Sequence, residues 1–308
     1  MCVKPHTSAE AETYHSIEHL TGRIDAGETS AQVYFQRGRA YKQIAYLSEA
    51  IADLTRALEG APQLSREDQA IAYDLRGMAH RRLGNFSDAI SDGTRALQLD
   101  PNQAPFWADR GWAYSAFGQM DLAMADFEHC LDLHPYFLAF IYRGMTHFVM
   151  GNHQAALDDY NQVIDLYPND IAFNSYLNRA ILRLLVHRDC SGAEADLNVA
   201  VVRNPDAVKP SPRPHAYRGL VRALQGRMDE ALADLEAGQA FGNDLMFPLA
   251  RGYVLQQRGN SVAVQEEMME FMHQSSENGM EVGYSLRILS GFLENPLSVI
   301  PQLIPLVA

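Results

Sequence analysis

Small, apolar and polar residues recur along this chain in a pattern that repeats about every 34 residues. In each repeat an Arg is followed at once by a small residue, and successive pairs stand 33 to 39 residues apart. The seven pairs are Arg37/Gly38, Arg76/Gly77, Arg110/Gly111, Arg143/Gly144, Arg179/Ala180, Arg218/Gly219 and Arg251/Gly252. Self-similarity at this period is typical of stacked helical hairpins, so the pattern predicts a solenoid rather than a single globular core.

Further columns become visible when the small residue of each pair is numbered position 8 of its block. Position 20 is Ala in six blocks, position 24 is mostly large, and position 32 is Pro in five. Small residues at positions 8 and 20 let two antiparallel helices approach closely, and the large residue fills the next gap. Pro at position 32 ends the second helix. The predicted blocks are residues 31–64, 70–103, 104–136, 137–170, 173–206, 212–244 and 245–273.

These columns resemble the tetratricopeptide repeat family over residues 31–273. The third block matches most fully, with Trp107, Gly111, Tyr114, Gly118, Ala123, Phe127 and Pro135. The seventh departs from the pattern, because Pro248 stands at position 4 and no Pro ends the block. The resemblance implies an all-α, right-handed superhelical solenoid of about seven helix-turn-helix repeats. It also implies that the first helix of each pair lines the concave face.

Two segments flank the predicted repeats. Residues 1–30 predict a tail and a capping helix, since Thr7 and Glu10 form a capping-box pattern ahead of an apolar stripe. Residues 274–308 predict a second capping helix over 280–293, followed by the apolar tail 297–308. A free tail this apolar is costly in water, so we expect it to be docked.

Two charged columns accompany the small ones. Position 7 is Arg in all seven blocks, and position 23 is acidic in all seven. The acids are Asp53, Asp92, Asp126, Asp159, Asp196, Asp234 and Glu267. An unpaired charge inside a helical stack is expensive, so the columns predict a ladder of Arg–carboxylate pairs. The alternative is that the Arg column forms an anion-binding stripe.

Composition narrows the partner class. The net charge of −13 and the pI near 5.2 argue against a nucleic-acid partner, which needs a basic stripe. The three cysteines have no close spacing, which suits a reducing compartment. No apolar run predicts a secretory signal or a membrane span. We therefore expect a cytoplasmic protein.

The resemblance assigns partner binding to a concave groove lined by positions 2, 5, 9 and 12 of each first helix, with position 13 nearby. In the first two blocks the candidates are basic, and in the later blocks they are mostly apolar. The basic candidates are Arg39, Lys42, Arg81 and Arg82. The others are Trp112, Ile141, Met145, Phe148, Leu177, Ile181, Leu184, Leu220 and Tyr253.

An open groove lined in this way would be a large exposed apolar patch, so we expect something to cover it. The prediction is a protein or peptide partner whose apolar or amphipathic segment binds in the groove, with an acidic end against the basic residues. Four alternatives stay open. The groove side chains pack across the superhelix, the tail 297–308 fills it, the tail drives self-association, or the groove holds a hydrophobic small molecule or lipid, with or without an unrecognised enzymatic activity.

Enzymatic motifs are absent from the sequence. It has no nucleophile motif, no phosphate-binding Gly-rich loop and no HExxH, so we predict no catalytic residue, metal ligand or cofactor. His15 and His19 stand one helical turn apart but have no evident third ligand, and we expect a solvated face. Relatives that clamp acidic chaperone C-termini carry Lys at position 5 and Asn at position 9 of one repeat. Phe35 and Arg39 stand there in the first block, so that activity is not expected.

Overall fold

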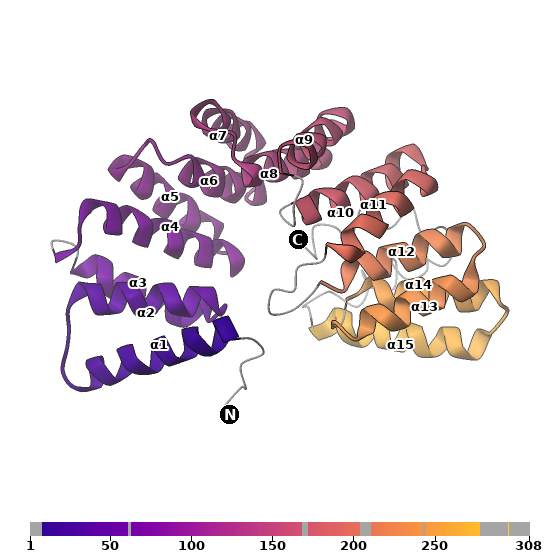
Figure 1. The fold of residues 1–308 in the computed structure, drawn as a ribbon, viewed down its shortest axis with the longest axis horizontal. Helices are drawn as coiled ribbons and strands as arrows, with labels where there is room; N and C mark the ends of the chain where they lie inside the picture. The colour runs from indigo at the N-terminus through magenta and orange to yellow at the C-terminus, as the bar shows by residue number, and fades with distance from the viewer. Residues whose placement is uncertain are drawn as a thin grey trace. The chain divides into compact units, whose positions relative to one another are not determined.

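The computed structural model describes residues 8–60, 63–167, 172–203, 211–242, 244–277 and 295. These residues form 15 α-helices and one π-helical turn, with no β-strand among them (Figure 1). The chain divides into two compact units, Met1–Asp159 and Tyr160–Ala308, which we call unit 1 and unit 2. The predicted capping box, the helix over 280–293 and the tail 297–308 lie outside the described residues.

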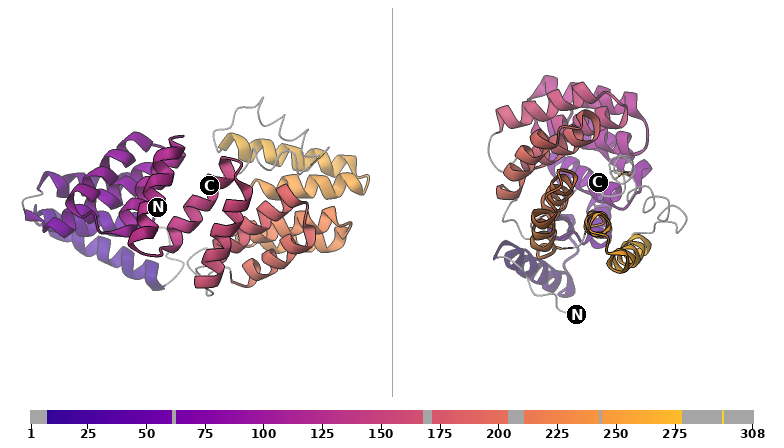
Figure 2. Two further views of the ribbon diagram at one scale, coloured as in Figure 1. Left: turned by 90° about the horizontal axis from the view of Figure 1, so that it is seen from above. Right: turned by 90° about the vertical axis from the view of Figure 1, so that its right-hand side faces the viewer.

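Within each unit, consecutive helices lie side by side in the order of the chain (Figure 2). The helices that begin in unit 1 are α1 (Ser8–Asp25), α2 (Ala31–Gln43), α3 (Leu47–Glu59), α4 (Arg66–Arg82), α5 (Phe86–Leu99), α6 (Ala104–Ala116), α7 (Met120–Leu133), α8 (Phe137–Val149) and α9 (His153–Leu166). Unit 2 continues with α10 (Phe173–Leu182), the π-helical turn η3 (Arg183–His187), α11 (Cys190–Val202), α12 (Arg213–Leu224), α13 (Met228–Gln239), α14 (Met246–Gln257) and α15 (Ser261–Glu277). This arrangement confirms the predicted all-α solenoid of helix pairs.

Close approach within a pair depends on the small residue at position 8. A Cβ atom added to Gly111 would lie 2.8 Å from the Phe127 ring, and one added to Gly38 would lie 2.9 Å from Leu54 Cγ. Both distances are shorter than carbon atoms tolerate, and Phe127 and Leu54 are fully buried. The small residue on the first helix therefore leaves the space in which the large residue of the second helix packs.

The fifth repeat departs from the others because it carries one extra residue. Other pairs turn through a residue with positive φ, such as Gly118 (84°) or Gly151 (80°). In the fifth pair this place is taken by Arg188, with φ of 54°, directly after the π-helical turn. A π-helical turn absorbs a single inserted residue without breaking the helix. The insertion is thus accommodated at the end of the first helix.

The predicted Arg–carboxylate ladder is confirmed in all seven pairs. In the third pair, Arg110 Nε and Nη2 donate to the two carboxylate oxygens of Asp126, both over 2.8 Å. The other six are Arg37–Asp53, Arg76–Asp92, Arg143–Asp159, Arg179–Asp196, Arg218–Asp234 and Arg251–Glu267. The last is the loosest, at 3.7 Å. Since the carboxylates are buried beside their guanidinium partners, these pairs are structural rather than an anion-binding stripe.

The ladder also joins five of the seven pairs to the helix before them, which the sequence columns did not reveal. Arg110 Nη1 donates to Thr94 Oγ1 of the preceding pair over 3.3 Å, and Arg76 Nη1 donates to Thr55 Oγ1 over 3.0 Å. Later in the chain the acceptors are amides, with Arg179 bonded to Asn161 and Arg218 to Asn198. These guanidinium groups therefore fix the register both within a repeat and against the helix before it.

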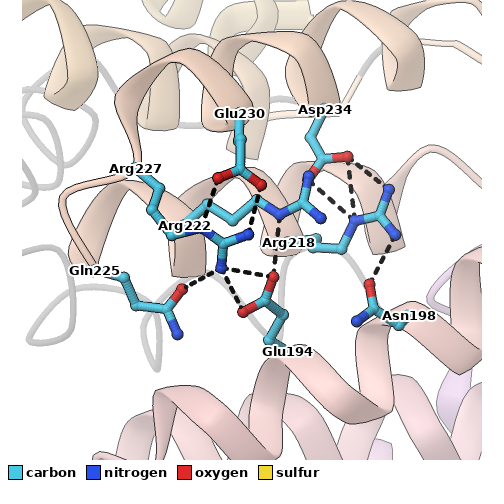
Figure 3. Close-up of polar contacts among 8 residues, drawn as sticks. All are labelled: Glu194, Asn198, Arg218, Arg222, Gln225, Arg227, Glu230 and Asp234. Carbon is cyan, nitrogen blue, oxygen red and sulfur yellow. Dashed lines mark hydrogen bonds and ion pairs between the residues drawn. The ribbon is translucent and has the colours of Figure 1, made fainter.

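Unit 2 extends the ladder into a network across α11, α12 and α13 (Figure 3). Arg222 reaches Asp234 over 2.8 Å and Glu194 over 3.1 Å. Arg227 pairs with the same Glu194 over 2.7 Å and with Glu230 over 2.5 Å. Glu194 thus accepts from two guanidinium groups of the next repeat and holds the two repeats together.

Replacing Asp126 by Ala should lower the free energy of unfolding by about 3 kcal/mol, because it leaves the half-buried Arg110 guanidinium without its carboxylate. Urea denaturation followed by circular dichroism measures the change. Asp132, an exposed acid on the same helix, provides the matched Ala control and should change stability by less than about 0.5 kcal/mol. Equal effects of the two substitutions would show that the ladder does not stabilise the fold.

The Glu194 network should make stability sensitive to acid. Burial by itself would raise the pKa of Glu194, but hydrogen bonds from Arg227 and Arg222 outweigh it and lower that pKa below its usual value. A depressed carboxyl pKa contributes stability above the unfolded pKa, near 4.3, and loses it as the pH falls through the folded pKa. The difference in unfolding free energy between wild type and Glu194→Gln should therefore be large at pH 7 and shrink by pH 3. Glu236→Gln, at an exposed position of α13, should show no such pH dependence.

Candidate functional site

The first helices of unit 1 line its inner face. In succession α2 contacts α4, α4 contacts α6, and α6 contacts α8. Within the described residues no contact of similar extent joins α3 to α5 or α5 to α7. The stack of unit 1 therefore curves toward its first helices, and side chains from several repeats converge on that side.

Three of those side chains form a stack across three repeats. The Arg81 guanidinium at the end of α4 lies 5.7 Å from the ring centroid of Trp112 on α6. Trp112 in turn stacks on Tyr142 of α8, with ring centroids 5.0 Å apart and planes inclined by 10°. We call these residues the Arg–Trp–Tyr stack. Its cation–π and ring contacts present a flat, half-buried aromatic surface on the inner face.

Two carboxylates, Asp74 on α4 and Asp109 on α6, lie beside the stack. Asp74 is only 9% exposed, and neither acid forms an ion pair in the part of the chain that the structure describes. Burial raises the pKa of Asp74 well above its usual range, with a further contribution from the Asp109 charge and an opposing one from Lys42. Burial likewise raises the pKa of Asp109 to about 6, against the opposing charges of Arg81 and Lys42.

Hydrogen bonding in this cluster is incomplete. Within the described residues, the buried atoms Asp109 Oδ1 and Arg81 Nε have no hydrogen-bond partner. Burial, with the neighbouring Asp109 charge, raises the pKa of Tyr142 to about 12, so its hydroxyl remains a donor at neutral pH. Buried charges without partners are costly, and such groups concentrate at functional sites. The cluster is therefore the strongest candidate site of unit 1.

The structure places the predicted basic residues of the groove in two settings. Arg39 and Arg82 are exposed, whereas Lys42 and Arg81 are half-buried near the acid pair. The two carboxylates offset part of the positive charge that we expected at this end. Asp74 and Asp109 could have been suspected from the sequence, because Asp74 stands at position 5, which is expected to face the groove, and Asp109 stands at the neighbouring position 6.

Of the nine predicted apolar and aromatic residues, four are buried and five are half-buried. Ile141 in unit 1 and Leu177, Leu184 and Leu220 in unit 2 are at most 4% exposed. The half-buried members are Met145, Phe148, Ile181 and Tyr253, together with Trp112. Trp112 is the predicted residue that the structure brings together with Arg81. A partner contact by any of these residues remains a prediction.

No group of three His, Cys, Asp or Glu side chains among the described residues is placed to hold a metal ion, and His15 and His19 are both exposed on α1. Burial raises the pKa of the Cys130 thiol to about 12, so it is protonated at neutral pH and is a poor nucleophile. None of the described helices is long and apolar enough to cross a membrane.

Comparisons with known proteins agree with the helical pattern. Family models described as tetratricopeptide repeat match residues 31–64, 70–103, 104–137 and 138–170. No curated protein matches the sequence of this chain.

Solved structures show the same fold. A tetratricopeptide repeat protein from Parabacteroides merdae is 17% identical with a TM-score of 0.59, over 87% of this chain and 98% of the other. The Cut9–Hcn1 assembly of the APC/C is 15% identical with a TM-score of 0.65, over 90% of this chain and 51% of the other. PilF of Pseudomonas aeruginosa is 14% identical with a TM-score of 0.57, over 68% and 93%. With its repeated Arg–small pairs, its stacked helix hairpins and four matched segments, this chain belongs to the tetratricopeptide repeat family.

Proposed function

We propose that this protein is a non-enzymatic adaptor that binds an amphipathic segment of another protein on the inner face of unit 1. Tetratricopeptide repeats generally mediate protein–protein interaction, so the family supports the class of function. The observation that carries the proposal is the Arg–Trp–Tyr stack beside two carboxylates that lack ion-pair partners among the described residues. The ladder already holds the repeats together, so the fold does not require this costly cluster.

The chemistry of the cluster indicates what kind of segment would bind. An apolar or aromatic side chain of the partner would pack on the half-buried rings of Trp112 and Tyr142, as aromatic anchors do at protein interfaces. Arg39 and Arg82 are exposed and would meet an acidic end of the segment. The half-buried polar side chains of the cluster would accept hydrogen bonds from polar atoms of the segment or donate hydrogen bonds to them. The site thus suits a segment with one apolar anchor and a nearby acidic end.

The alternative, a hydrophobic small molecule or lipid in the groove, has less support. It needs an exposed apolar lining, and three of the five residues predicted to supply it in unit 2, Leu177, Leu184 and Leu220, are buried among the helices. The other two, Ile181 and Tyr253, are half-buried. Protein binding is therefore the better-supported function, and the capture experiment below distinguishes it from small-molecule binding.

Trp112→Ala should reduce recovery of a specific polypeptide by at least tenfold in affinity capture from native lysate, because loss of an aromatic anchor costs about 2 kcal/mol of binding. Quantitative mass spectrometry of proteins and small molecules measures the loss. Trp107→Ala is the matched control, since Trp107 is also half-buried but bonds to the Pro101 carbonyl and stacks on His129. Equal capture by both variants, or loss of a small molecule instead of a polypeptide, would contradict the proposal.

The acid pair should make stability fall with rising pH. Because the folded pKa of Asp109 is raised to about 6, its contribution is fully present below the unfolded pKa near 3.9 and is lost as the pH rises through about 6. Asp109→Asn removes the charge and keeps the shape. It should raise the unfolding free energy at pH 7.5 by on the order of 2 kcal/mol, with little effect near pH 4. A difference that is the same at both pH values would show that Asp109 is ionised with an ordinary pKa.

A further inference from the structure

One edge of unit 1 exposes apolar side chains, and the opposite edge does not. The edge in question holds the turns that join the first helix of each pair to the second. Six of the large hydrophobic residues that are exposed among the described part of the chain lie there, namely Tyr46, Leu83, Phe117, Leu122, Val149 and Met150. Among the described residues at the other edge of unit 1, only Leu133 is exposed in this way. We call the six residues the turn edge. Single exposed apolar residues are ordinary, but this one-sided concentration is not.

The turn edge is continuous from the first turn to the third. An open, shallow hollow of about 300 Å³ lies between the first two turns, lined by Ala45, Tyr46, Leu47, Ser48, Glu49 and Leu83. The second and third turns are joined by the rings of Phe86 and Phe117, whose centroids lie 6.5 Å apart. Tyr46 also stacks on Tyr41, at 6.2 Å. The edge is therefore an apolar, partly aromatic surface rather than a set of separate residues.

Three acidic side chains lie beside this surface, together with one exposed basic residue, Arg82, next to Leu83. Glu49, Asp88 and Asp121 lie in the first turns of α3, α5 and α7, and all three are exposed. None forms an ion pair in the part of the chain that the structure describes. An acid at a helix N-terminus stabilises the helix, which accounts for the placement of these residues. Their charge nevertheless favours a partner with Lys or Arg next to its apolar residues.

The spacing of the edge selects the conformation of that partner. Leu83, Phe117 and Met150 stand at the same place in successive repeats, 34 and 33 residues apart. The first helices of successive repeats are in contact, and packed helices lie about 8–10 Å apart. A polyproline II helix presents the same face every three residues, about 9.3 Å along its axis, whereas a β-strand does so about every 6.7 Å. An α-helix is about 10 Å wide and the hollow is open, so a helix would contact this surface along one face only.

We propose that the turn edge is a second binding surface, separate from the inner face, for an extended polyproline II segment with an apolar residue at every third position and basic residues between. Aromatic rings on a shallow surface are what such segments dock against in other recognition domains. The exposed acids supply the complementary charge. This surface would let the protein hold two partners at once.

Fluorescence anisotropy with a labelled 15-residue peptide, five repeats of Lys-Pro-Leu, tests the proposal. We expect binding that weakens at least tenfold in the Leu83→Gln/Phe117→Gln double variant and weakens with added salt. Both positions are exposed, so the variant should fold, and circular dichroism checks this. Leu133→Gln, at the opposite edge, is the matched control and should bind as wild type does. Trp112→Ala should also leave this binding unchanged, which keeps the test independent of the inner face.

Three outcomes would overturn the proposal. The first is equal binding of a peptide of the same composition in which the leucines no longer recur every third residue. The second is tighter binding of a helical peptide with leucines seven residues apart, which would assign the edge to a helix. The third is no binding of the Lys-Pro-Leu peptide, together with a change in sedimentation of the double variant, which would assign the edge to contact between copies of this chain.

Discussion

The buried pairing of one Arg with one carboxylate in every repeat is the constraint on which this structure depends. A guanidinium and a carboxylate removed from water must meet with good geometry, because either one alone would carry a large desolvation penalty. In the third repeat Arg110 satisfies Asp126 with two nitrogens and Thr94 of the preceding helix with the third. The same three-way contact recurs around Arg37 and Arg76. Apolar packing brings the helices together, and these contacts set how far each one slides along its neighbour.

The two units differ in the residues that surround the Arg–carboxylate ladder. Position 11 of the first four repeats is Tyr or His, whereas it is Arg183 in the fifth and Arg222 in the sixth. Arg183 adds a second guanidinium to Asp196, and Arg222 does the same for Asp234 while also reaching Glu194. Unit 2 therefore ties its repeats together with charge. In unit 1 the position holds no Arg, and Tyr41 and Tyr114 lie there against the guanidinium groups of Arg37 and Arg110.

On the inner face of unit 1 the sequence keeps residues that do not give the most stable fold. Replacing Asp74 and Asp109 by apolar residues would remove two buried charges without touching the ladder. The sequence nevertheless keeps them beside the Arg–Trp–Tyr stack. This retention distinguishes the cluster, as a candidate recognition site, from ordinary packing. The turn edge is unfavourable for the opposite reason. It leaves apolar surface in water, where polar turn residues would serve the fold equally well.

The repeat columns by themselves determined the fold and the ladder. Gly111, Phe127, Arg110 and Asp126 recur at fixed spacing, and the period of the α-helix places each type on a known side of its helix. The third contact that five of the guanidinium groups make with the preceding helix, with Thr94 for example, could not be predicted, because it depends on how one repeat stacks on the next.

The same limit applies to the site. Sequence position placed Arg81 and Trp112 on the same side of the solenoid, but it did not show that Trp112 stacks on Tyr142 or that Asp109 is buried beside them. It also predicted a groove lined by Ile141 and Leu220, which the structure buries. Local periodicity determines on which side of its own helix a side chain lies. Whether that side chain ends in water or in the interior depends on the curvature and packing of several repeats, which only the tertiary structure decides.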